Sequence, residues 1–106
     1  MNNFKAIYRI LKHLDKHKGD ESFDLSLISA EACKLDYASW EQIMIELQVN
    51  GYIRGIVYDQ TLGDKFPHIE EPIQPQITLT GMEYLAENSM LKKAADILKT
   101  AGDIIA

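Results

Sequence analysis

The chain has 106 residues, of which 46% are hydrophobic and 25% charged, and its formal net charge is −5 at pH 7. This length and composition predict one globular domain and exclude disordered, fibrous and multi-domain chains. No apolar run approaches the ~20 residues that span a bilayer, and charges interrupt the N-terminal stretch where a signal peptide would be apolar. We therefore expect a cytoplasmic protein without a membrane contact, and its single cysteine, Cys33, agrees with a reducing compartment.

Residues 3–17 are predicted to form an amphipathic helix, because apolar side chains repeat there at helical spacing. The other side of this helix carries a basic stripe at i, i+4, i+7 and i+11, formed by Lys5, Arg9, Lys12 and Lys16. Such a stripe is either a solvated helix surface or a docking stripe for an acidic partner. After a turn over residues 19–22, Phe23 and Leu25 are candidates for a short edge strand. Residues 26–35 then predict a short second helix with Leu27, Ile28, Ala32 and Leu35 on its inner side.

A third helix is predicted over residues 36–50. Its apolar face has the spacing i, i+3, i+4, i+7 and consists of Trp40, Ile43, Met44 and Leu47. Asp36 can cap the first turn, and Gly51 can end the helix because glycine adopts the left-handed conformation without strain. A strand over residues 52–58 follows. The order helix, tight turn, helix, strand is typical of a winged helix-turn-helix.

Three prolines and Gly63 in residues 59–75 rule out a regular helix or a central strand, so this long loop is predicted to be the wing. Strand signal returns at residues 76–79, and Thr80 with Glu83 forms a capping box that starts a further helix. A break is expected at Asn88 and Ser89. A final helix over residues 90–105 has an apolar stripe that includes Leu91, Leu98 and Ile105.

The predicted fold is therefore α+β: a winged helix with a long wing and an additional C-terminal helix. We divide the chain into a winged-helix domain, residues 1–88, and a C-terminal helix, residues 89–106. The apolar stripe of that helix is expected to pack on the domain or against a second subunit.

Several short motifs resemble the YjcQ-like family, small uncharacterised proteins of Gram-positive bacteria and their phages or prophages. They are Gly51-Tyr52-Ile53, Ile77-Thr78, Gly81, Tyr84-Leu85, Glu87-Asn88 and Lys93-Ala94. Their order and spacing carry the resemblance across most of the chain, except for the second helix and the wing. The resemblance implies a winged-helix fold and a phage-related context. It brings no catalytic or ligand-binding residues.

No motif predicts catalysis, a metal site or a cofactor. His13 and His17 stand at i, i+4 but lack a third ligand, and neither Cys33 nor His68 lies in a ligand-spaced motif. Cys33 also has no histidine near it in sequence that would activate it as a nucleophile. We expect a non-catalytic protein without bound metal or cofactor.

Two functions compete: DNA binding, which is usual for winged helices, and protein binding. Residues 36–50 contain three carboxylates and no Lys or Arg, and residues 59–75 contain four carboxylates and one lysine. A phosphate backbone would be repelled there, so we favour contact with a protein partner or self-association, with transcriptional regulation through DNA as the alternative. If the protein does bind DNA, the residues of the basic stripe should make the contact. The third helix is expected to turn outward the residues opposite Trp40, which are Ala38, Gln42, Ile45 and Val49.

Overall fold

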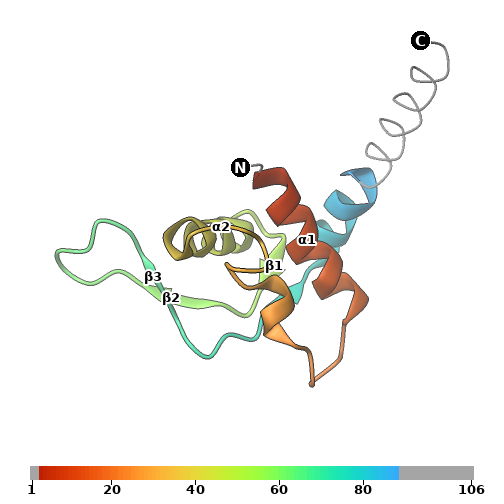
Figure 1. Ribbon diagram of the computed structural model, residues 1–106, viewed down its shortest axis with the longest axis horizontal. Helices are drawn as coiled ribbons and strands as arrows, with labels where there is room; N and C mark the ends of the chain where they lie inside the picture. The colour runs from red at the N-terminus through yellow and green to blue at the C-terminus, as the bar shows by residue number, and fades with distance from the viewer. Residues whose placement is uncertain (1–2, 89–106) are drawn as a thin grey trace, which may run out of the picture.

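The computed structural model describes residues 3–88 and shows a mixed α+β, winged-helix-like arrangement (Figure 1). Its elements are α1 (Asn3–Lys16), a 3-10 helix η1 (Leu25–Ile28), α2 (Tyr37–Val49), β1 (Ile53–Arg54), β2 (Val57–Asp59), β3 (His68–Glu70) and β4 (Gln76–Ile77). Residues 79–88 are also helical. None of the described helices is long and apolar enough to cross a membrane. The predicted break at Ser89 and the stripe of Leu91, Leu98 and Ile105 lie outside the described residues.

Helix α1 is amphipathic, as its sequence predicts. The side that faces the protein interior holds Ala6, Ile10, Leu11 and Leu14, all buried. This side packs against η1 and β4. The basic stripe therefore lies on the outer side of the helix, away from the core.

Helix α2 begins and ends as the sequence predicts. The Asp36 carboxylate accepts a hydrogen bond from the Ser39 backbone N–H at 3.2 Å and a second from the Ser39 hydroxyl at 2.7 Å. These bonds lower the pKa of Asp36, because they favour its charged form. At the other end Gly51 has φ +83°, the left-handed conformation that stops a helix. Trp40 is buried, and its indole N–H donates to the Ile28 carbonyl at 2.8 Å.

The predicted second helix over residues 26–35 is wrong, because only the 3-10 helix η1 and one following turn form there. Leu25 begins η1, so the expected edge strand is absent as well. Side chains offer the backbone other partners in this segment: Asp24 accepts from the Ser26 N–H at 3.0 Å, and the Ser29 hydroxyl accepts from the Ala32 N–H at 3.1 Å. Such local bonds compete with a continuous helical ladder.

A single long hairpin follows α2, and its strands pair in two separate places. At its base β1 pairs antiparallel with β4, with Ile53 opposite Ile77, and further out β2 pairs antiparallel with β3. Between the two ladders Gly55 has φ +95°, and a side-chain carbon there would collide with the Gln74 carbonyl oxygen. The wing of this fold is thus residues 55–75, all of the chain between β1 and β4.

The base of the wing is closed by a junction that we call the neck, made of Gly51, Tyr52, Thr78, Gly81 and Tyr84. The Thr78 hydroxyl donates to the Gly51 carbonyl, and the Thr78 N–H donates to the Tyr52 carbonyl at 3.1 Å. The Gly81 N–H donates to the Thr78 hydroxyl oxygen at 3.0 Å. The rings of Tyr52 and Tyr84 lie 4.9 Å apart. A side chain on Gly81 would collide with the Tyr52 carbonyl, so glycine is required for this approach.

Candidate protein-contact surface

The wing folds back over the side of α2 that faces away from Trp40. Ile45 is only 4% exposed and belongs to one core cluster with Ile56, Ile69 and Ile73 of the wing. The expectation that Ile45 faces outward is therefore wrong. Helix geometry alone places Ile45 opposite Trp40, but the wing supplies a second buried side that the local sequence does not reveal. Its predicted companion Val49 is 61% exposed, so the two do not form a shared patch.

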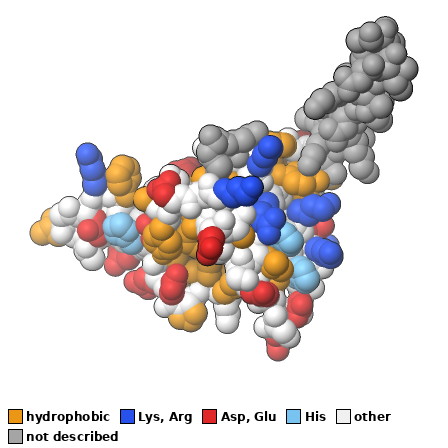
Figure 2. All heavy atoms as spheres, viewed as in Figure 1, with side chains coloured by type: hydrophobic (Ala, Val, Ile, Leu, Met, Phe, Trp, Pro, Cys, Tyr) orange, Lys and Arg blue, Asp and Glu red, His pale blue; other side chains and the backbone are white. Residues whose placement is uncertain are grey.

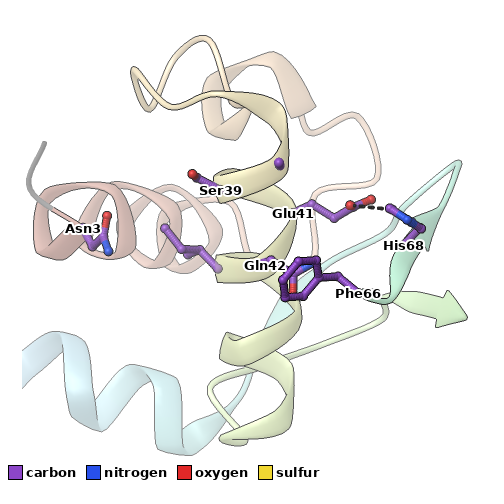
Figure 3. A pocket seen from close by; sticks show the side chains of 8 residues that line it. Asn3, Ser39, Glu41, Gln42, Phe66 and His68 are labelled. Atoms are coloured by element: carbon purple, nitrogen blue, oxygen red, sulfur yellow. Dashed lines mark hydrogen bonds and ion pairs between the residues drawn. The ribbon is translucent and has the colours of Figure 1, made fainter. Parts of the chain in front are cut away.

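Glu41 of α2 holds the wing through a buried carboxylate. It is 4% exposed; its Oε1 lies 2.9 Å from Nδ1 of His68, and its Oε2 accepts from the Ile69 N–H at 2.9 Å. Figure 3 shows the Glu41 and His68 side chains pointing toward each other from α2 and the wing. A buried carboxylate is costly unless it is hydrogen-bonded, and both of its oxygens are bonded here.

Two glutamine side chains of α2 add further bonds to the wing backbone. Gln42 donates to the Pro67 carbonyl at 3.1 Å. Gln48 both donates to the Ile56 carbonyl and accepts from the Ile56 N–H, each at 2.8 Å, which are the two bonds that a neighbouring strand would make. We call Glu41, Gln42 and Gln48 the wing clasp. Of its three residues only Gln42 was predicted from sequence to face outward, and its amide donates to the wing.

A depression of about 430 Å³ lies where α2 meets the wing (Figure 3). Its lining residues are Asn3, Ala38, Ser39, Glu41, Gln42, Ile43, Phe66 and His68. Phe66 is 55% exposed at the rim, while the Glu41 carboxylate is already satisfied by the wing. The depression therefore offers an aromatic ring and amide groups. The hydroxyl of Ser39, which also lines it, donates to the Asp36 carboxylate at 2.7 Å rather than to the histidine, so the two do not form a nucleophile–base pair.

Of the candidate metal and nucleophile residues, His68 lines this depression, whereas His13, His17 and Cys33 do not. The rings of His13 on α1 and His17 just after it stack 6.5 Å apart, and within residues 3–88 no group of three or more His, Cys, Asp or Glu side chains is arranged to hold a metal ion. Burial, and after it the charge of Arg9, lowers the pKa of His13. Cys33 is buried, which raises the pKa of its thiol, so the less reactive protonated form is favoured.

The tip of the wing is an ordered turn that presents apolar side chains, a feature that sequence analysis missed. The Asp64 carboxylate accepts from the Thr61 N–H at 3.1 Å and from the Thr61 hydroxyl at 2.6 Å, and the Gln60 amide donates to the Asp64 carbonyl at 2.9 Å. These bonds fix a turn on which Leu62 is fully exposed; Phe66, four residues further along the chain, is 55% exposed. We call Leu62 and Phe66 the wing tip. The only sequence signal was two large apolar residues within a turn-rich segment.

Charge divides the surface into two regions. In Figure 2 most of the Lys and Arg side chains that face the viewer gather over α1, while carboxylates are spread over the rest of the described surface. The exposed edge of α2 adds Glu46 and the aliphatic Ala38 and Val49, but no cation. On the wing, Lys65 is the one cation among four carboxylates. The described surface around α2 and the wing is therefore acidic and partly apolar.

Comparison with known proteins places the chain in a family. The model of the family described as YjcQ protein matches residues 8–104. No curated protein and no solved structure matches the chain significantly. The matched range contains the neck, where Gly51-Tyr52, Thr78, Gly81 and Tyr84 of the short motifs meet; Lys93-Ala94 lies outside the described residues. Because the match covers most of its length, the chain belongs to the YjcQ protein family.

Proposed function

We propose that this protein is a non-catalytic interaction module that acts through contacts with another protein. The observation that carries this proposal is the position of the wing against α2. In a DNA-reading winged helix, this helix enters the major groove and offers polar side chains to base edges. Here Gln42 and Gln48 are hydrogen-bonded to the wing backbone, and Ile45 is buried beneath it. The helix has no free base-reading face on that side.

Electrostatics favour the same proposal. Proteins that bind duplex DNA neutralise several phosphates with Lys and Arg, and this term supplies much of their affinity. Helix α2 carries no Lys or Arg, and the wing carries only Lys65. A DNA-binding regulator, the alternative function, would have to use the basic stripe on α1, which is not the recognition helix of a winged helix. The phage or prophage context implied by the resemblance remains a prediction.

The wing tip is the proposed contact surface. Leu62 and Phe66 are large apolar side chains in water, and the Asp64 turn holds this segment before any partner arrives. A partner that covers them removes apolar area from water without first ordering the loop. The chemistry therefore favours an apolar or aromatic pocket on another protein.

Site-specific photo-cross-linking in cells of the native host tests this function. A photoreactive residue at Leu62 should give a discrete protein adduct, and a second substitution, Phe66→Asp, should abolish it. The matched control places the same residue at Glu21, an exposed position in the turn after α1. Equal adducts at both positions, or no adduct at Leu62, would contradict the proposal.

Duplex binding is measured in parallel by fluorescence anisotropy at ~0.15 M salt. We expect no saturable binding in the micromolar range. Micromolar or tighter binding with a steep salt dependence would favour the DNA alternative. Charge reversal in the basic stripe, Lys5→Glu with Lys12→Glu, would then locate the contact on α1.

A further inference from the structure

The outer side of α1 forms a continuous cationic ridge. Its members are the basic stripe, Lys5, Arg9, Lys12 and Lys16, of which the lysines are exposed and the arginine is half-buried. They follow one another at steps of three or four residues, so the ridge spans about 16 Å at 1.5 Å per residue. The opposite side of the helix is fixed in the core, which holds the ridge in one orientation.

Arg9 is positioned before any ligand binds. Its Nε donates to the Leu27 carbonyl at 2.9 Å, a bond that fixes the side chain and does not use the two terminal nitrogens of the guanidinium. Two terminal N–H groups of this kind bind a carboxylate in a bidentate manner. Fixing the side chain in advance lowers the entropy that binding would otherwise cost.

Carboxylates in the described part of the chain do not pair with the ridge. Within residues 3–88 none of the ion pairs includes a ridge residue: Asp15 pairs with Lys18 at 3.0 Å, and Asp20 lies 3.6 Å from His17. Lys12 lies 5.7 Å from the centre of the Tyr8 ring, a cation–π contact that brings no negative charge to the lysine. The surrounding positive charge is also felt at His13, whose pKa is lowered by burial first and then by Arg9, His17, Lys16 and Lys12.

We propose that the ridge binds an acidic helical segment of a protein partner whose carboxylates repeat at i, i+4, i+7 and i+11. A helix laid alongside α1 brings one carboxylate to each cation, because both helices share the same repeat and pack 8–10 Å apart. The partner is a peptide rather than a nucleic acid, because a duplex seated on α1 would bring dense phosphate charge toward a protein of net charge −5. This surface is separate from the wing tip and goes beyond the proposed function.

Anisotropy with labelled peptides tests the proposal. The patterned probe is a capped 16-residue Ala/Gln peptide with Glu at i, i+4, i+7 and i+11, and the scrambled probe has the same composition with its Glu residues around the whole helix. We expect the patterned probe to bind about tenfold more tightly than the scrambled one at ~50 mM salt. A 12-base-pair duplex is the phosphate probe and should bind more weakly than the patterned peptide.

Matched variants locate the contact. Lys5→Glu with Lys12→Glu should weaken binding of the patterned probe about tenfold. Lys34→Glu with Lys65→Glu makes the same change in net charge at positions outside α1 and should change binding less than about twofold. Arg9→Lys keeps the charge but loses the fixed fork, so a loss of about threefold is expected. Circular dichroism confirms that each variant is folded.

Several results would overturn the proposal: no binding of the patterned probe, equal binding of both peptides, tighter binding of the duplex, or equal losses in the two charge-reversed variants. Phe66→Asp at the wing tip should leave peptide binding unchanged. A failure of the wing-tip contact and a failure of the ridge can therefore be told apart.

Discussion

Replacing Glu41 by alanine is expected to lower the free energy of unfolding by about 2–4 kcal/mol. The change leaves the buried Ile69 N–H without its acceptor; an unsatisfied buried group costs ~1–3 kcal/mol, and the loss is larger where the missing partner is a charged group. The contact with His68 adds little, because that side chain is 59% exposed and exposed ion pairs contribute ~0–1 kcal/mol. For a chain of this size the loss corresponds to a melting temperature about 10–20 °C lower.

Urea denaturation followed by the fluorescence of Trp40 measures this loss. Trp40 is the only tryptophan, is buried, and precedes Glu41 in α2. Glu41→Gln should retain most of the stability, because the amide oxygen can still accept from the Ile69 N–H. His68→Ala is the control and should cost less than ~1 kcal/mol. Hydrogen exchange at the Ile69 amide should accelerate in Glu41→Ala, which reports the loss at the wing itself.

Two results would refute this account of the wing clasp. A cost below ~0.5 kcal/mol for Glu41→Ala would show that the buried carboxylate does not hold the wing. An equal cost for His68→Ala would mean that the ion pair, and not the bond from the Ile69 backbone, supplies the stability.

Three further predictions concern the neck and the histidines. Gly81→Ala should destabilise the protein by ~1–3 kcal/mol in thermal or urea unfolding, because the alanine side chain would collide with the Tyr52 carbonyl, although alanine has the better helix propensity. The control, Glu87→Ala on the exposed side of the same helix, should change stability by less than ~0.5 kcal/mol. Burial and neighbouring cations hold the pKa of His13 below its ordinary value of 6.5, so on acidification the unfolded chain takes up this proton before the folded protein does. The free energy of unfolding should therefore fall as the pH drops below 6.5. In melting curves His13→Gln should make the stability less dependent on pH in this range. Protein purified without chelator should contain no stoichiometric transition metal by elemental analysis, and a metal lost on changing His13 and His17 to Ala would contradict this.

Helix α2 could be predicted closely because its signals are local. Asp36 caps it, the apolar spacing from Trp40 defines its inner side, and Gly51 ends it, all within sixteen residues of sequence. The prediction of the second helix failed for an equally local reason. The apolar residues of this segment do have helical spacing. However, the side chains of Asp24 and Ser29 accept hydrogen bonds from nearby backbone N–H groups, which favours short turns over a continuous helix.

The burial of Glu41 could not be predicted, because its partner is far away in the sequence. The Ile69 N–H that it accepts from lies 28 positions further along the chain. A carboxylate on the flank of an amphipathic helix normally remains in water. Only the fold of the wing shows that this flank is a second buried side, and the same fold explains why Ile45 is buried.

The position of the neck limits what membership of the family implies about binding partners. The five residues of the neck are joined by backbone hydrogen bonds, the Thr78 hydroxyl and a ring contact. Together they connect the two ends of the wing at its base. Motifs at such a point specify how the loop is tied at its base. The surfaces proposed to meet another molecule lie elsewhere, at the far end of that loop and on α1. A match to the family through the neck therefore does not specify what the chain binds.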